Sequence, residues 1–360
     1  SSNEKINFTA KIHFSFSHMS TEIFPLLTKS TYLNTAYVGP MSKSLAAFRR
    51  KHEADYVQNG GEYKINAYKA IEETHETLAN FFGSSPDNTF VVPNFSIGIR
   101  TAISLLPKKF NILMFTEEYP SLVKAFEERD FHVHKIKMQP FIEQAIEKRL
   151  ALGNIDVLAL SIVQFASGLL IDLKFLKKIK NQYPNLILVG DGTQFLGGHN
   201  FNFDSSPFDI VAASGYKWLL AGFGNGVMMI SEAYLNLIQK KSIALFNLIF
   251  NGHFNILATA SLKFAIEAFE NNNFGLLMKK KEDLTQHARK LLNEYNLIDP
   301  WVSQRVQHSG IFIIKGEKDL HKKLIKNNIR CVPRGEGVRV SFHYYNTNKD
   351  LDRLLNVIKN

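Results

Sequence analysis

The sequence predicts an α/β protein with a mostly parallel seven-stranded sheet, helices on both faces of that sheet, and a smaller α+β domain at the C-terminal side. Three observations predict this fold class. Short apolar segments recur along the first two thirds of the chain, amphipathic segments lie between several of them, and the pattern changes after about residue 232.

The apolar segments are rich in leucine or β-branched residues and are nearly continuous in their hydrophobicity. These properties are typical of parallel strands that are covered on both faces. We expect the seven strands at residues 88–94, 110–116, 131–137, 155–163, 185–191, 208–214 and 226–231.

The stretches between several of these strands place apolar residues at helical spacing and predict amphipathic helices. The helices are expected at residues 97–109, 119–130, 141–152 and 173–184. Because strands and helices alternate, the sheet is expected to be mainly parallel.

The pattern differs in the last third of the chain. Two long helices are expected at 258–270 and 279–295, followed by three β segments and a last helix at 348–360. We therefore divide the chain into an N-terminal arm (1–35) that packs with the small domain, a large α/β domain (36–254) and a small α+β domain (255–360).

Composition narrows the possible partners. The chain has 360 residues, is 45% hydrophobic and carries a formal net charge of +10. Its lysines are scattered in strings such as "LKKIKNQ" (176–182) and "MKKKED" (278–283), which fit solvated helix faces. With no RNP-type or zinc-finger pattern, this distribution argues against a nucleic-acid partner.

Cysteine usage and hydropathy bear on the compartment. Cys331 is the only cysteine, so an internal disulfide or a cysteine-based zinc site is excluded, and we expect no metal site. The single cysteine fits a reducing compartment. No apolar run approaches the roughly 20 residues of a membrane span. We therefore expect a cytoplasmic protein that does not enter a membrane.

Three polar clusters follow predicted strands. "PNFSIGIR" (93–100) places Ser96 where a helix opens, "VGDGTQFLGG" (189–198) contains Asp191 and Gln194, and "ASGYKW" (213–218) contains Ser214 and Lys217. Ligands of open α/β sheets bind at the carboxyl ends of strands. A helix N-terminus with small hydroxyl groups is suited to an anion such as a phosphate.

An acid, a lysine and an anion site on adjacent strand ends predict pyridoxal phosphate (PLP) as cofactor. A lysine amine forms the Schiff base, and a desolvated aromatic setting keeps part of it neutral. A carboxylate paired with the pyridine nitrogen maintains the ring as an electron sink. The sequence "GFGNG" (222–226) lacks the full glycine spacing of a dinucleotide fingerprint and is interpreted as a tight turn near the pocket.

The same residues carry a resemblance. The segments 189–198 and "FDIVAASGYKWLLAGFGNGVMMIS" (208–231) resemble the class V aminotransferase family, PLP enzymes of fold type I that include cysteine desulfurases, kynureninases and isopenicillin N epimerase-like proteins. The resemblance extends to "YLNTAYVGPMS" (32–42), "EEYPS" (117–121), "SIVQFASGLLIDL" (161–173) and "VRVSFHYYNTNKDLDRL" (338–354). It therefore covers most of the chain.

This resemblance implies a role for each matching residue. Lys217 would form the Schiff base, and Asp191 would pair with the pyridine nitrogen. The remaining cofactor contacts would come from Gln194, Ser214, Tyr216 (where many relatives have histidine), Ser96 with the Phe95 backbone, Tyr119 stacked on the ring, and Gln164 near O3′. The substrate carboxylate would be bound by Arg339, with Asn34 and Arg334 as further substrate-binding candidates. His253 would reach the cofactor of a partner subunit, which implies a homodimer with its active site at the subunit interface.

Each residue also has a simpler interpretation. Lys217 could be a structural lysine, and Asp191, Ser96 and Ser214 could be caps. Tyr119 could be an ordinary aromatic side chain, Arg339 could face solvent from a strand, and His253 could be a turn residue. Arg334 competes with Arg339 for the same carboxylate.

The sequence predicts the cofactor more clearly than it predicts the reaction, because one fold can support several reactions. The leading hypothesis is an aminotransferase acting on an amino acid, in which Arg339 holds the α-carboxylate and Lys217 moves the α-proton. A lyase or epimerase of the same family is the alternative. A cysteine desulfurase is less favoured because the only thiol, Cys331, lies in a strand-like segment. A catalytically silent PLP-fold binding protein is the hypothesis from another class.

Overall fold

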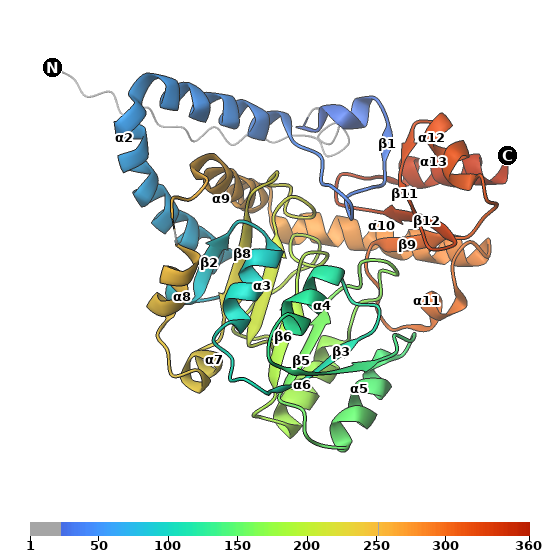
Figure 1. The fold of residues 1–360 in the computed structure, drawn as a ribbon. Coiled ribbons are helices and arrows are strands. Elements are labelled where there is room, and N and C mark those ends of the chain that lie inside the picture. The colour runs from blue at the N-terminus through green and yellow to red at the C-terminus, as the bar shows by residue number, and fades with distance from the viewer. Residues whose placement is uncertain (1–22, 251) are drawn as a thin grey trace.

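The computed structural model describes residues 23–250 and 252–360, in which one large sheet and two small ones are formed (Figure 1). All seven predicted strands are present and make up the large sheet. They are β2 (Thr89–Val92), β3 (Asn111–Phe115), β4 (His132–Ile136), β5 (Val157–Ser161), β6 (Ile187–Asp191), β7 (Ile210–Ser214) and β8 (Gly226–Ile230).

The large sheet has the order β2-β8-β7-β6-β5-β3-β4. Only β8 is antiparallel to its neighbours, and the other strands run in one direction. The carboxyl ends of β2, β3, β5, β6 and β7 therefore lie at one edge of the sheet. This arrangement places the segments after Val92, Phe115, Ser161, Asp191 and Ser214 together.

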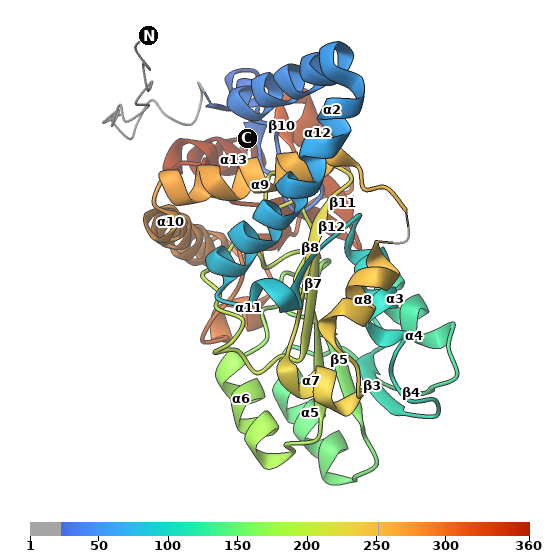
Figure 2. The ribbon, with the colours of Figure 1, turned by 90° about the vertical axis from the view of Figure 1, so that its left-hand side faces the viewer.

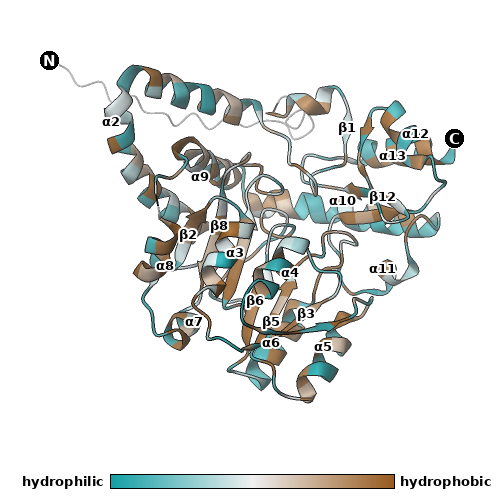
Figure 3. Ribbon diagram, in the orientation of Figure 1, coloured by the Kyte–Doolittle hydropathy of each residue, from teal (hydrophilic) through white to brown (hydrophobic). Residues whose placement is uncertain are grey.

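Helices cover both faces of the large sheet, as predicted (Figures 1 and 2). Alternate strand residues face opposite cores: Leu158 and Leu160 of β5 belong to one, Val157 and Ala159 to the other. The first core is closed by α2 (Lys43–Phe82), α5 (Ile142–Ala151), α6 (Leu173–Gln182), α9 (Ile256–Asn271) and the start of α10 (Phe274–Glu294). The second is closed by α3 (Phe95–Ile103), α4 (Pro120–Glu127), α7 (Glu232–Leu237) and α8 (Ser242–Ile249). The strands between these layers are mostly hydrophobic (Figure 3).

The C-terminal region builds a three-stranded antiparallel sheet of order β11-β12-β9. Its elements are β9 (Ile311–Ile314), β10 (Ile329–Arg330), β11 (Val332–Arg334), β12 (Gly337–Ser341), α11 (Pro300–Gln304), α12 (Leu320–Lys326) and α13 (Asn348–Lys359). A third core joins this region to the second half of α10. Arg339 lies on the central strand, β12.

The chain before α2 contacts this C-terminal region. β1 (Thr31–Tyr32) pairs in parallel with β10, and Leu33 belongs to the third core. Two short 3-10 helices, η1 (Pro25–Thr28) and η2 (Pro86–Asn88), complete the described elements. Residues 1–22 of the predicted arm lie outside the described residues.

Helix α2 was not expected from the sequence. It spans 40 residues and bends at Gly60, where φ is 42° (Figure 1). A positive φ of this kind favours glycine, so the sequence "NGG" (59–61) marks the bend. Beyond it, Tyr63, Ala67 and Ile71 are buried, and the helix packs against α9.

The scattered lysines are not all solvated. Lys281 in "MKKKED" is 1% exposed, with its Nζ 5.4 Å from the ring centroid of Trp218.

Within residues 23–250 and 252–360, no helix has the length and apolarity to cross a membrane. The same residues contain no group of three or more His, Cys, Asp or Glu side chains placed to hold a metal ion.

Candidate active site

A cavity of about 330 Å³ lies at the strand ends where the polar clusters were predicted to meet. Eight of the predicted site residues line it: Phe95, Ser96, Tyr119, Asp191, Gln194, Ser214, Tyr216 and Lys217. They come from the ends of β6 and β7, from the start of α3 after β2, and from the loops that follow β3, β6 and β7. The parallel sheet therefore brings together residues that are far apart in the sequence.

Lys217 is only 8% exposed and lies between two aromatic rings. Its Nζ is 5.7 Å from the ring centroid of Tyr119 and 5.6 Å from that of Tyr216. Burial lowers the pKa of Lys217 to about 8, while the charge of Asp191 opposes that shift. In the part of the chain that the structure describes, this amine forms no ion pair. A buried, partly neutral amine of this kind is suited to nucleophilic chemistry.

Asp191 ends β6 and is buried beneath the cavity. The Thr193 N–H donates to Asp191 Oδ1 at 2.9 Å. Burial raises the pKa of Asp191, and the hydrogen bonds from Thr193 and the charge of Lys217 counter that effect. The carboxylate is thus placed to interact with a cationic group bound in the cavity.

The N-terminus of α3 provides donors at another side of the cavity. Asn94 caps this helix by accepting from the Ile97 N–H at 3.0 Å. The Phe95 N–H donates to Ser214 Oγ at 2.9 Å, and Ser96 Oγ accepts from Ser121 Oγ at 2.6 Å. Backbone amides and serine hydroxyls at a helix N-terminus suit a phosphate group.

The two glutamines have different environments. Gln194 lines the cavity, accepts from Trp218 Nε1 at 2.7 Å and donates to the Ala36 carbonyl at 2.9 Å. Gln164 does not line the cavity. Its amide group donates to the Glu117 carbonyl and accepts from the Ala166 N–H, so it holds the loop after β5.

Arg339 and Arg334 approach from the C-terminal sheet without lining the cavity itself. Arg339 Nη1 donates to the Phe165 carbonyl at 2.6 Å, and the Arg334 guanidinium lies 5.7 Å from the Phe165 ring centroid. Phe165 lines the cavity. Burial lowers the pKa of Arg339 to about 10, and both guanidinium charges lower the pKa of Lys217. Within the described ranges neither arginine pairs with a carboxylate.

Two other predicted residues lie apart from the cavity lining. Asn34 is half-buried, and its Oδ1 has no hydrogen-bond partner among residues 23–250 and 252–360. His253 is exposed and lines a different hollow with Tyr56, Tyr63 and Phe250. Within one chain, His253 is therefore not a residue of the Lys217 cavity.

Other side chains at the site were not singled out from the sequence. Ser161, Phe165, Thr193 and Phe223 line the cavity, and Glu118 is buried beside it. All five belong to segments that carry the family resemblance in the sequence. Glu118 precedes Tyr119 in "EEYPS", but a pattern does not show which of two adjacent glutamates is buried.

Close backbone contacts hold in place the loop after β7 that carries Lys217. The Gly39 N–H donates to the Tyr216 carbonyl at 2.9 Å, and a Cβ at Gly39 would lie 2.1 Å from the Lys217 carbonyl oxygen. A Cβ at Gly197, whose φ is 85°, would lie 2.6 Å from the Trp218 carbonyl oxygen. These contacts explain why "YVGP" and "FLGG" place glycines where they do.

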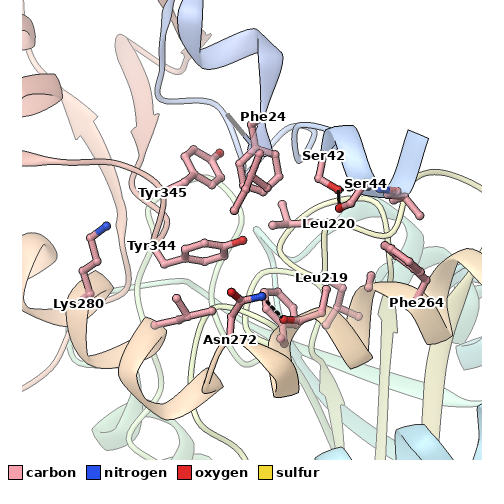
Figure 4. A pocket seen from close by; sticks show the side chains of 16 residues that line it. Phe24, Ser42, Ser44, Leu219, Leu220, Phe264, Asn272, Lys280, Tyr344 and Tyr345 are labelled. Carbon is pink, nitrogen blue, oxygen red and sulfur yellow. Dashed lines mark hydrogen bonds between the residues drawn. The ribbon is translucent and has the colours of Figure 1, made fainter. Parts of the chain in front are cut away.

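A second, smaller crevice of about 110 Å³ lies between Phe24, α9, α10 and the turn at Leu219 and Leu220 (Figure 4). Phe24, Tyr344 and Tyr345 face one another across it. Its lining is mostly apolar and includes none of the predicted site residues. This crevice is therefore separate from the candidate active site.

The residues of the Lys217 cavity fit PLP. It offers a buried amine that pairs with no carboxylate of the described residues, a buried carboxylate, aromatic side chains beside the amine, and a helix N-terminus for a phosphate. These features define a PLP-dependent enzyme, with Lys217 and Asp191 placed to hold the cofactor.

Comparisons with known proteins agree with this class. The profile of the family described as aminotransferase class-V matches residues 38–354, and the chain belongs to that family. A probable cysteine desulfurase of Borreliella burgdorferi is 21% identical, and the similarity covers 92% of this chain and 93% of that protein.

Solved structures show the same fold. A variant of C-DES with glycine covalently linked to its PLP cofactor has a TM-score of 0.84 at 14% identity, covering 94% of this chain and 98% of that one. The apo cysteine desulfurase of Thermococcus onnurineus NA1 has a TM-score of 0.80 at 16% identity, covering 96% and 98%. The cystine C-S lyase C-DES with its product cysteine persulfide has a TM-score of 0.79 at 15% identity, covering 93% and 99%.

Proposed function

We propose that this protein is a PLP-dependent lyase that cleaves the carbon–sulfur bond of an amino acid and releases the sulfur-containing fragment into solution. The observation that carries the proposal is the buried Lys217 amine, with two guanidinium groups nearby and no accessible thiol. The expectation of an aminotransferase is not confirmed, because the relatives just described are desulfurases and a C-S lyase.

Cys331 supports release of the sulfur instead of its capture by the protein. It is the only cysteine of the chain and is 4% exposed. Burial raises the pKa of its thiol to about 12, and its Sγ contacts the Ile329 carbonyl at 3.8 Å. Because the thiolate is the nucleophilic form, this side chain is poorly suited to accept sulfur.

The chain's own residues can perform each task of such a reaction. Lys217 would bind the cofactor and then, as a free amine, remove the proton from Cα of the substrate. Arg339 would hold the α-carboxylate, Asp191 would hold the proton on the pyridine nitrogen, and the α3 N-terminus with Ser214 would bind the phosphate. The bound cofactor would supply an electron sink for the charge at Cα.

The leaving group decides which amino acids react easily. When the Cβ–S bond breaks, the electron pair stays on sulfur, so a disulfide releases a persulfide anion. With cystine and one water molecule, the products are cysteine persulfide, pyruvate and ammonia, and no external oxidant or reductant is needed. Cystine also carries two carboxylates, which matches the two guanidinium groups of Arg339 and Arg334, since neither pairs with a carboxylate of the described residues.

The test uses the purified protein loaded with PLP. Borohydride reduction followed by peptide mapping is expected to place the pyridoxyl label on Lys217. Incubation of a separate, unreduced sample with cystine is expected to give pyruvate and persulfide in equal amounts without an added keto acid. Formation of products only when a keto acid is supplied would show transamination instead.

A matched variant separates lyase from desulfurase chemistry. Cys331→Ser should keep pyruvate and persulfide formation within about twofold, because a buried cysteine behaves mainly as a small apolar side chain. Loss of sulfur release while the variant remains folded would favour a desulfurase that uses this thiol.

We further propose a homodimer in which the active site lies near the subunit interface. Tyr56, Val57 and Ile65 of α2 and Ile243 of α8 are at least half exposed, at 60%, 85%, 70% and 56%. Large exposed apolar side chains are candidates for an interaction site. In such a dimer His253 would face the partner's cofactor.

The cytoplasmic location predicted from the sequence also remains a proposal.

A further inference from the structure

Glu118 is a buried acid at the candidate active site that the chemistry described above does not use. It follows β3, is 4% exposed, and lies directly before Tyr119. Its Oε1 accepts from the Ser161 N–H at 3.0 Å and its Oε2 contacts Ser161 Oγ at 2.5 Å. In residues 23–250 and 252–360, no lysine, arginine or histidine forms an ion pair with it. A buried carboxylate without a cation is costly.

Ser161 connects this acid to the cavity. Its side chain lines the cavity, and in the parallel ladder Ser161 is the register partner of Asp191. Glu118 follows β3 and Asp191 ends β6, and β5 with Ser161 at its end lies between these two strands. The two buried carboxyl groups therefore flank Ser161, and Asp191 shares the cavity with the Lys217 amine. Two buried carboxylates near each other disfavour ionisation of both.

We propose that Glu118 is a positioning residue that carries a proton in the working enzyme: its protonated Oε2 donates to Ser161 Oγ, the Ser161 hydroxyl is then free to donate into the cavity, and of the two buried carboxyl groups only Asp191 is charged. The proton remains on Glu118 and no bond is made or broken in this role. The inference concerns the PLP site and does not depend on which reaction the enzyme catalyses.

The electrostatics of the site agree with this assignment. Burial raises the pKa of Glu118 to about 7, with the Asp191 charge adding to the shift and the donors of Ser161 and Tyr119 opposing it. The charged group that acts on Glu118 is Asp191, and the titratable side chain next to it in the chain is Tyr119, whose pKa the Asp191 charge also raises.

The first experiment follows urea unfolding of the apoprotein against pH for wild type and Glu118→Gln. A raised native pKa stabilises the wild type fully below the unfolded-state pKa near 4.5, and this stabilisation is lost as pH rises through 7. We expect the wild type to lose stability relative to Glu118→Gln between pH 5 and 8. Glu117→Gln, at the exposed neighbouring glutamate, should show the pH dependence of the wild type.

The second experiment measures the PLP dissociation constant of the same proteins. Above pH 7 the wild type is expected to lose affinity relative to Glu118→Gln, by at most about tenfold per pH unit, because one proton is linked to binding. Ser161→Ala removes a hydrogen-bond donor to the ionised Glu118 carboxylate. The pH range over which the free energy of unfolding falls should therefore move to higher pH in this variant. A constant difference between wild type and Glu118→Gln from pH 5 to 8, or an unmoved transition in Ser161→Ala, would overturn the proposal.

Discussion

At the scale of single residues, the site combines groups whose burial would otherwise weaken the protein. Lys217 is charged below pH 8 in a setting that disfavours charge, and Asp191 and Glu118 are buried acids with raised pKa values. Such perturbed groups are common at active sites and are less common in cores that serve only stability.

Replacement of Lys217 by methionine should therefore stabilise the apoprotein while abolishing PLP labelling. The pKa falls from 10.5 to about 8 on folding, which corresponds to about 3 kcal/mol of lost stability at neutral pH. Wild-type stability should rise with pH between 8 and 10.5, because the unfolded chain binds the proton there. Urea unfolding at pH 7 and pH 10 checks this, and the advantage of Lys217→Met should be much smaller at pH 10. An equal advantage at both values would contradict the assigned pKa.

The two arginines should differ in their effect on substrates. Arg339→Gln is expected to lower kcat/KM roughly 100-fold for every substrate, because a charge-assisted hydrogen-bonded pair is lost. Arg334→Gln should lower it only for a substrate with two carboxylates, such as cystine, and not for S-methylcysteine. Steady-state kinetics on both substrates test this. If Arg334→Gln affected both equally, the second carboxylate site would be assigned wrongly.

At the scale of elements, the sequence predicted the sheet well because strands buried on both faces leave a continuous apolar signal. "IDVLALSIV" and "NLILVGD" became β5 and β6 with their carboxyl ends at the cavity. Helix α2 was not predicted, because its first half carries polar residues without an apolar stripe and its "NGG" resembles a loop. Its helical state depends on packing against α9, which a local pattern cannot show.

The direction in which a side chain points could not be predicted from the sequence either. Gln164 and Gln194 both follow predicted strands, yet only Gln194 lines the cavity. Gln164 instead closes its own loop by accepting from the Ala166 N–H. The burial of Lys281 had no local signal either, since its neighbours Lys279 and Lys280 belong to the same polar string.

The cap of α3 gives a prediction at this scale. Asn94→Ala should cost about 1 kcal/mol of unfolding free energy through the lost N-cap, and should also weaken PLP binding. Asn255 is a matched control, because it caps α9 by accepting from the Ala258 N–H at 3.0 Å and does not line the Lys217 cavity. Urea unfolding and PLP titration of both variants are required. Equal losses of PLP affinity would mean that the effect is general destabilisation.

At the scale of the whole molecule, the fold is stabilised by three hydrophobic cores. Two lie on opposite faces of the large sheet, and the third joins α10 to the C-terminal sheet. The cavity lies where loops of the large sheet meet the arginines of β11 and β12. The substrate-binding role proposed for these arginines would therefore require both sheets to be formed.

The exposed apolar side chains of α2 give a prediction at this scale. Ile65→Asp should shift the protein from dimer to monomer in size-exclusion chromatography with light scattering, because a charge would be buried in the interface. Leu152→Asp is the control, since Leu152 is 79% exposed at the end of α5. A monomeric wild type, or dissociation by both variants, would argue against the proposed interface.

The burial of Cys331 has a practical consequence. Because the only native thiol is shielded, a cysteine introduced on the surface would be the one site that reacts quickly with a maleimide dye. A fluorophore attached through Phe223→Cys, at a 63% exposed position that also lines the cavity, could report ligand entry in real time without removal of the native cysteine. Single-site labelling would therefore require one substitution only, because the buried Cys331 would react slowly with the dye.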